Sequence, residues 1–277
     1  RSGGPRSGAT IVYGSTRKAV EAVRRGLASR GLPAHAYHAA LPGRLRTLVQ
    51  QRFLEDPNPI VVATNAFGMG IDRPDVRQVI HYQLPASLEA YYQESGRAGR
   101  DGKDALCLAL FGARDRRVQD RFLRLAHPPG HRLKRLHRFL VRSLRPGVEA
   151  DLSASEVVDG LGGRVGEEDG TAALKALARC GVITLEELEG ELPAAGGPLE
   201  GPGNRSSPRF SVVLRCRSLS LDLLDRRRTA EETKLESVLR YARSRRCRRA
   251  AILSYFGEQP PKGGCGRCDR CTRDGNR

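Results

Sequence analysis

Apolar and polar positions between residues 10 and 112 alternate between short apolar runs and longer amphipathic stretches. Short apolar runs predict strands, and a periodicity of about 3.6 residues predicts helices. The run at 60–64, IVVAT, is typical of a strand buried on both faces. The predicted strands lie at 10–13, 34–38, 60–64, 76–81 and 105–111, and the predicted helices at 15–30, 44–54 and 88–94. Their alternation predicts an α/β domain with a mostly parallel sheet.

Ligands of such sheets bind outside the carboxyl ends of the strands. The loops that follow four of the predicted strands are therefore candidate binding sites, and they begin after Tyr13, His38, Thr64 and His81.

The pattern changes after residue 113. An arginine-rich helical stretch covers 114–145, and its basic residues are spread too evenly along the sequence to form one stripe. A solvated face and a nucleic-acid face are both open for these residues, which are Arg132, Lys134, Arg135, Arg138, Arg142 and Arg145. Residues 150–216 predict helix, helix, strand, a Gly/Pro-rich loop over 193–208, and strand, which is the order of a winged helix. Residues 229–277 predict two helices and a cysteine-rich end.

The composition favours a polyanionic partner. The net charge is +17, but only six of the 48 basic residues are Lys, and a GC-rich genome also produces arginine excess. No run of 18 apolar residues exists, so no membrane span is expected. The first eight residues lack the apolar core of a signal peptide, and the chain begins without Met, so we expect a fragment of a longer protein.

The segment 93–102, QESGRAGRDG, carries two arginines three residues apart, each beside a glycine. A guanidinium binds phosphate oxygens bidentately, and glycine lets a bulky anion approach. Such an arginine can stabilise the charge of a phosphoryl-transfer transition state. The alternative is a turn with two solvated arginines.

A second candidate follows the buried strand, where 64–74 reads TNAFGMGIDRP. Thr64 and Asn65 stand at a strand end, where they can bind a phosphodiester backbone, and Asp72 can accept hydrogen bonds from a ribose or an arginine. The alternative is a glycine-rich strand exit with Asp72 as a local cap.

Four cysteines predict a metal site, with three in the spacing C-x2-C-x2-C at 265, 268 and 271 and Cys247 further upstream. Four thiolates satisfy a tetrahedral Zn²⁺, whereas the three-cysteine run alone also suits an iron–sulfur cluster. With no secretory signal, metal ligation is favoured over disulfides. The other cysteines, Cys107, Cys180 and Cys216, are predicted to be buried or half-buried thiols.

Taken in order, these segments resemble the RecQ family of DNA helicases. IVYGSTR at 11–17 resembles helicase motif IV, and YHAALP at 37–42 resembles an element that this family uses against DNA, with Ala40 where Gly is usual. ATNAFGMGID at 63–72 resembles motif V, and YQESGRAGRDG at 92–102 resembles motif VI. The stretch 247–269 resembles the zinc subdomain of the family, which favours zinc over an iron–sulfur cluster.

The resemblance implies a role for individual residues. Arg100 is the expected arginine finger for the γ-phosphate of ATP, with Arg97 beside it, and Gln93 is expected to couple nucleotide state to domain closure. Gly70 and Asp72 are expected to line the nucleotide together with both arginines. The residues expected to face DNA are Ser15, His38, Thr64 and Asn65, although His38 can instead be a packed strand histidine. The expected zinc ligands are Cys247, Cys265, Cys268 and Cys271.

Two departures limit the resemblance. No G-x-x-x-x-G-K-[ST] and no Asp-Glu pair in a Walker-B context occur, so the chain carries half of an ATP site. Helicases of this kind supply the other half, with ATP and Mg²⁺, from a preceding RecA-like domain. In addition, the winged-helix-like stretch precedes the zinc ligands instead of following them, so no DNA contacts are assigned to it.

The predicted fold is α/β, a RecA-like parallel sheet domain followed by a winged-helix-like α+β insert and a small helical zinc subdomain with four cysteine ligands. The predicted segments are a flexible N-terminal segment (1–9), the second RecA-like helicase domain (10–125), a basic helical connector (126–149), the insert (150–216) and the zinc subdomain (217–277).

The predicted function is that of the C-terminal portion of an ATP-dependent DNA helicase in repair or recombination, inactive alone and acting on single-stranded DNA and duplex junctions. The expected compartment is the bacterial cytoplasm near the nucleoid, or the nucleus in a eukaryote. One alternative is an ATP-independent zinc and winged-helix DNA-binding module; a weaker one is an RNA helicase.

Overall fold

The computed structural model describes residues 7–68, 71–188 and 208–274. The chain divides into two compact units. Residues 1–119 and 233–277 form the first unit, and residues 120–232 form the second. Helices α4 (Ala113–Ala126) and α8 (Asp222–Arg243) each cross a boundary between the units along the chain. Within the described residues, no helix is both long and apolar enough to cross a membrane.

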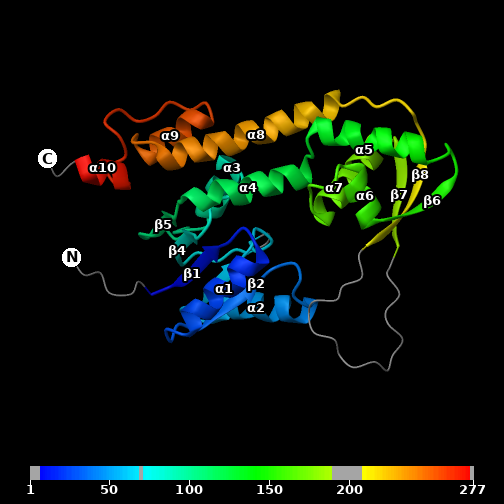
Figure 1. Ribbon diagram of the computed structural model, residues 1–277. Helices are drawn as coiled ribbons and strands as arrows, with labels where there is room; N and C mark the ends of the chain where they lie inside the picture. The colour runs from blue at the N-terminus through cyan, green and yellow to red at the C-terminus, as the bar shows by residue number, and fades with distance from the viewer. Residues whose placement is uncertain (1–6, 69–70, 189–207, 275–277) are drawn as a thin grey trace, which may run out of the picture. The chain divides into compact units, whose positions relative to one another are not determined.

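The first unit contains a five-stranded parallel sheet in the order β2-β3-β1-β4-β5 (Figure 1). The strands are β1 (Ala9–Tyr13), β2 (Ala34–Tyr37), β3 (Ile60–Ala63), β4 (Val76–His81) and β5 (Leu106–Ala109). The predicted parallel α/β sheet is confirmed. Because all five strands run the same way, their carboxyl ends meet at one edge.

Three helices connect these strands: α1 (Arg17–Ala28), α2 (Gly43–Glu55) and α3 (Leu88–Ser95). The hydroxyl of Thr16 accepts the Ala19 N–H at 3.0 Å and caps α1, as a threonine at this position is expected to do. Helix α2 packs on one face of the sheet through Phe53, and α1 packs on the other through Val20. The sheet is thus buried on both faces at β1 and β3, as the apolar run of β3 predicts.

The second unit is a winged helix. Its elements are α5 (Gly130–Ser143), β6 (Glu149–Ser153), α6 (Ala154–Gly160), α7 (Glu167–Arg179), β7 (Ile183–Leu188) and β8 (Arg209–Leu214). The strands form an antiparallel sheet in the order β6-β8-β7. Most of the predicted Gly/Pro-rich loop at 193–208 lies outside the described residues.

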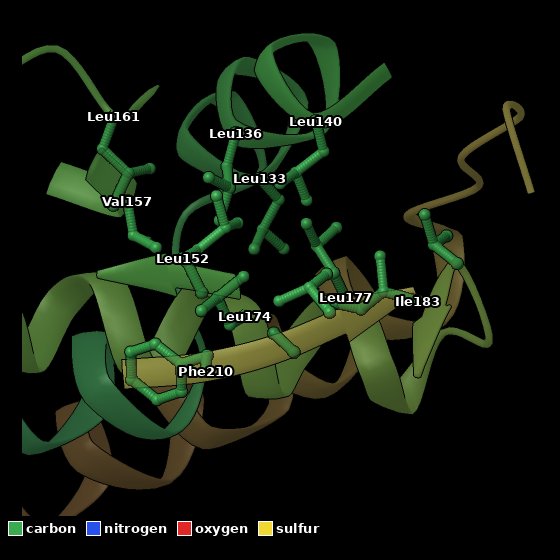
Figure 2. Packing of buried hydrophobic residues seen from close by; sticks show 14 of the residues in the cluster. Leu133, Leu136, Leu140, Leu152, Val157, Leu161, Leu174, Leu177, Ile183 and Phe210 are labelled. Carbon is green, nitrogen blue, oxygen red and sulfur yellow. The ribbon is translucent and has the colours of Figure 1, made fainter. Parts of the chain in front are cut away.

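One hydrophobic core holds this unit together, and Figure 2 shows its side chains converging from the helices onto the sheet. Leu133, Leu136 and Leu140 of α5 are fully buried in it. Helix α5 lies in the stretch predicted as a connector, but its leucines make it part of the core of the second unit.

The last part of the chain belongs to the first unit and contains α9 (Arg248–Tyr255), α10 (Asp269–Asp274) and the second half of α8. Helices α8 and α9 contact α3 through tyrosine side chains. The rings of Tyr91 and Tyr241 lie 5.2 Å apart, and the Tyr255 hydroxyl donates a hydrogen bond of 2.7 Å to Glu89. Helix α3, which precedes the two glycine-flanked arginines, is therefore packed against the cysteine-rich end of the chain.

Candidate functional site

The arginine loop, residues 96–102, is fixed to the start of β4. The Gly99 N–H donates to the carbonyl of Val76 at 3.0 Å, and the Asp101 N–H donates to the carbonyl of Pro74 at 3.3 Å. The buried Arg77 forms an ion pair with Asp101 through both carboxylate oxygens. The Arg77 guanidinium holds the pKa of Asp101 below its ordinary value. The loop is thus positioned by the strand beneath it.

Arg97 joins the arginine loop to the glycine loop, residues 64–74. Its Nη1 donates to the carbonyl of Gly68 at 2.5 Å. Gly68 has φ +128°, and a Cβ at this position would lie 2.4 Å from Cζ of Arg97. The Tyr13 hydroxyl donates to the neighbouring carbonyl of Phe67 at 3.3 Å. Burial raises the pKa of Tyr13, so the hydroxyl stays protonated as a donor.

Arg100 lies at the surface and is paired with Asp72 across the two loops. Its Nη1 lies 2.6 Å from Oδ1 of Asp72, and the two side chains are 41% and 88% exposed. An exposed pair of this kind contributes about 0–1 kcal/mol. An incoming anion can therefore replace Asp72 as the partner of Arg100 at little energetic cost.

Two further predictions on the nucleotide side concern Gln93 and Gly70. Gln93 is exposed on α3. Gly70 lies outside the described residues. The assignment of both residues to nucleotide binding stays a prediction.

All four residues predicted to face DNA follow strand ends at the carboxyl edge of the sheet. The N–H of Ser15 donates to Gln83 at 2.9 Å, and its hydroxyl accepts from Gln119 at 3.2 Å. Thr64 donates its N–H to the carbonyl of Tyr37 at 3.1 Å, and Asn65 beside it is exposed. At this edge the Asn65 side chain is therefore exposed to solvent, whereas Ser15 and the backbone of Thr64 already form hydrogen bonds within the fold.

His38, the fourth, is 7% exposed and contacts α1. Its Nε2 lies 3.3 Å from Glu21. Burial opposes ionisation of Glu21, but hydrogen bonds from Arg24 and His38 outweigh it and lower its pKa. His38 is therefore in the packed environment that was the alternative to a DNA contact.

The two groups of predicted residues lie at opposite ends of the strands. The DNA group follows the carboxyl ends of β1, β2 and β3, whereas the arginine loop is bonded to the first residue of β4. The glycine loop leaves the carboxyl end of β3 and leads to the start of β4. One loop thus connects the two regions.

Two buried contacts near the site were not predicted. Buried Arg73 donates to the backbone carbonyl of Phe53 and, at 2.8 Å, to that of Asp56, where α2 ends. His81 Nε2 lies 2.7 Å from Glu94 in the core beneath α3. Each pair spans loops or helices, so sequence spacing gave no signal for it.

The four predicted metal ligands form one cluster. The Sγ atoms of Cys247, Cys265, Cys268 and Cys271 all lie within 4.8 Å of one another. The separation is 3.5 Å between Cys268 and Cys271, and 4.0 Å between Cys265 and Cys271. Four sulfurs around a tetrahedral Zn²⁺ with bonds of about 2.3 Å lie about 3.8 Å apart. The cluster therefore fits zinc.

Backbone groups and an arginine support the cluster. Burial opposes ionisation of the Cys268 thiol, but hydrogen bonds from backbone N–H groups, the first that of Arg248, outweigh it and lower its pKa to about 6. A thiolate is the form that binds the metal. The Arg248 side chain also binds Asp269 at 2.9 Å, which joins α9 to α10. Of the other cysteines, Cys107 and Cys216 are exposed, so their predicted burial is wrong.

Two family models match the chain. "Helicase conserved C-terminal domain" matches residues 5–102, which hold the sheet up to β4 and both loops, and "RecQ zinc-binding" matches residues 215–272, which hold the four cysteines. Neither of these two models covers residues 103–214.

Known helicases resemble part of the chain. The RecQ-like DNA helicase blm-1 of Caenorhabditis elegans is 52% identical over 105 residues, which are 38% of this chain and 11% of that protein. The ATP-dependent DNA helicase RecQ of Bacillus subtilis (strain 168) is 47% identical over 115 residues, which are 42% of this chain and 19% of that protein. The matched part of the chain therefore spans less than a quarter of the length of these relatives.

A solved structure of the DEAD-box protein SrmB from E. coli matches 43% of this chain and 72% of that chain at 25% identity. The TM-score of this match is 0.38.

The parallel sheet with its two loops defines the C-terminal domain of a helicase. The zinc-binding match and both relatives point to one type within this class, the RecQ helicases. Together, the two family models and both relatives support a RecQ-family helicase C-terminal region with the RecQ type of zinc subdomain.

Proposed function

We propose that the chain supplies the second motor domain of an ATP-dependent DNA helicase that unwinds duplex DNA in repair or recombination. The observation that carries the proposal is the exposed pairing of Arg100 with Asp72. Arg100 is fixed through its loop to β4, but the partner of its guanidinium among the described residues is a surface carboxylate. This combination suits a group that has to reach a phosphate on another domain.

In this proposal, ATP and Mg²⁺ are held mainly by a preceding RecA-like domain with Walker A and B segments. Arg100 exchanges Asp72 for the γ-phosphate and stabilises the charge of the transition state as an arginine finger. Arg97, whose guanidinium already binds the glycine loop, positions that loop. Gly70 and Asp72 line the nucleotide, and Gln93 couples its state to domain closure.

The carboxyl edge of the sheet is the proposed nucleic-acid side. Asn65 is exposed there and is the best placed of the predicted residues to contact a phosphodiester backbone. Because the glycine loop runs from this edge to the arginine loop, nucleotide binding at one end can move the DNA contacts at the other. The proposed substrates are single-stranded DNA and duplex junctions, in the bacterial nucleoid or the nucleus.

The zinc cluster has a structural role in this proposal. All four ligands are cysteines, which leaves no open coordination position for chemistry. The metal would hold α9 and α10 together. Helix α9 packs against α3, and the arginine loop directly follows α3 in the sequence.

The test uses the protein with the preceding RecA-like domain present. Arg100→Ala should leave ATP binding nearly unchanged and reduce DNA-stimulated ATP turnover by about 10³-fold or more, as an arginine finger does. The matched control is Lys103→Ala, which removes an exposed cation just beyond the arginine loop. Wild-type turnover in Arg100→Ala would contradict the assignment. DNA binding with no ATP turnover in the intact protein would favour the ATP-independent binding module.

A further inference from the structure

The second unit carries a one-sided basic helix. In α5, His131, Lys134, Arg135, Arg138 and Arg142 are all solvent-accessible. At 3.6 residues per turn these five positions fall within an arc of about 100°. Leu133, Leu136 and Leu140 occupy the opposite side and point into the core (Figure 2). We call the five accessible residues the basic face of α5.

The sequence-based prediction that these basic residues are spread too evenly to form one stripe is wrong for α5. Arg132 is the residue that breaks the pattern, because it lies on another side of the helix, where its Nη1 binds Asp169 at 2.7 Å. Once Arg132 is assigned to that ion pair, the other basic residues of the helix share one face.

The basic face has no carboxylate partner within the part of the chain that the structure describes, whereas several other basic groups of this unit do have one. Arg121 is paired with Glu168 at 2.5 Å and Lys175 with Glu187 at 2.5 Å. Like charges four residues apart on a helix destabilise it by about 0.2–0.5 kcal/mol each. Lys134, Arg138 and Arg142 form two such pairs in sequence, and a polyanion bound along them would remove this repulsion.

Helix α7, by contrast, is unsuited to phosphate. It is the second helix of the α6–α7 pair, the position from which a helix-turn-helix reads DNA. Its first turn contains Glu167, Glu168 and Asp169. Its basic residues are occupied, Lys175 by Glu187 and Arg179 by the carbonyl of Ala126 at 3.1 Å. The usual recognition helix therefore begins with acidic groups.

We propose that the basic face of α5, and not α7, binds the phosphate backbone of DNA. Lys134, Arg138 and Arg142 extend along about 12 Å of helix, a length over which duplex DNA carries about seven phosphate charges. Contacts of this kind position a protein on DNA without reading its sequence. The inference deepens the proposed helicase function by naming a further DNA-binding surface, and it rests on that function only for the choice of DNA as the polyanion.

The experiment measures DNA affinity of the 277-residue chain without ATP. A fluorescent duplex with a single-stranded tail is titrated by anisotropy between about 50 and 200 mM salt. The test variant combines Lys134→Gln, Arg138→Gln and Arg142→Gln. The control variant combines Arg164→Gln, Arg217→Gln and Arg226→Gln, three exposed arginines of the same unit.

The slope of log affinity against log salt should become shallower by about 2.7 in the test variant, since each lost phosphate contact accounts for about 0.9. The control should change it by much less. Equal slopes in the two variants would overturn the proposal. This would also be the result if the basic face binds an acidic protein and not DNA.

Two further measurements keep the result interpretable. The thermal midpoint of the test variant should equal or exceed that of the wild type, because repulsion is relieved. Arg138→Gln alone should reduce the slope by about 0.9, which tests the same contact with a smaller change. Failure here leaves the helicase assignment intact, because that assignment depends on ATP turnover of Arg100→Ala and not on this slope.

Discussion

Replacing Gly68 with alanine should disrupt the contact between the glycine loop and Arg97. The new Cβ would lie 2.4 Å from Cζ and 2.6 Å from Nη2 of Arg97, so the guanidinium would have to move. Moving it breaks the 2.5 Å hydrogen bond to the Gly68 carbonyl. The backbone also keeps φ +128°, which a side chain tolerates poorly.

The magnitude follows from these two effects. A non-glycine residue in such a conformation costs about 1–3 kcal/mol, and a lost hydrogen bond to a charged group costs about 1.5–3 kcal/mol. We expect Gly68→Ala to lower the free energy of unfolding of the first unit by about 3–5 kcal/mol. The matched control is Gly31→Ala, where φ is +76° but no atom lies within 4 Å of the new Cβ. Only the conformational cost of about 1–2 kcal/mol applies there.

The assay is native-state hydrogen exchange of the amides of β1 and β3, which reports on the first unit alone. A double-mutant cycle with Arg97→Ala separates the two effects. In the Arg97→Ala background, the cost of Gly68→Ala should fall to that of Gly31→Ala. If Gly68→Ala costs no more than Gly31→Ala with Arg97 present, the proposed contact between the two loops is refuted.

Two further predictions concern the metal and pH. Cys268→Ser should abolish stoichiometric zinc binding and remove the hydrogen-exchange protection of α9, because metal binding supplies the folding free energy of such a subdomain. The control Cys216→Ser alters a thiol outside the cluster and should do neither. Zinc retained in Cys268→Ser would contradict the set of four ligands. The pKa of Asp101 is lowered in the folded state by Arg77, so its stabilisation is present above the unfolded pKa of about 3.9 and is lost as pH falls below it. Asp101→Asn should therefore flatten the acid side of the stability profile of the first unit, and an unchanged profile would show that this pair does not contribute.

The sheet was predictable because its determinants are local. An uninterrupted apolar run such as 60–63 fits a strand buried on both faces, and Thr16 is a helix cap with a recognisable sequence position. The cysteine cluster was predictable for a similar reason, since three of its ligands are spaced at fixed short intervals.

The contacts within the site were not predictable in this way. Arg97 and Gly68 are 29 residues apart, and their contact depends on the paths of two loops. Arg73 has the surroundings of an ordinary loop arginine in the sequence, yet it is buried against the end of α2. On α5, helical periodicity alone places five basic residues on one face, and the structure adds that Arg132, which lies off this face, is held in an ion pair.

The division of the chain into units has a consequence for synthesis. The first unit is interrupted by the 113 residues from 120 to 232, whereas the second unit is continuous. At about 5–20 residues per second, a ribosome needs about 6–23 s to make that stretch. The second unit can fold during this interval. The aromatic side chains of α3, however, cannot pack until Tyr241 and Phe256 have been synthesised. Nascent chains should therefore expose α3 to chaperones until the cysteine-rich end emerges.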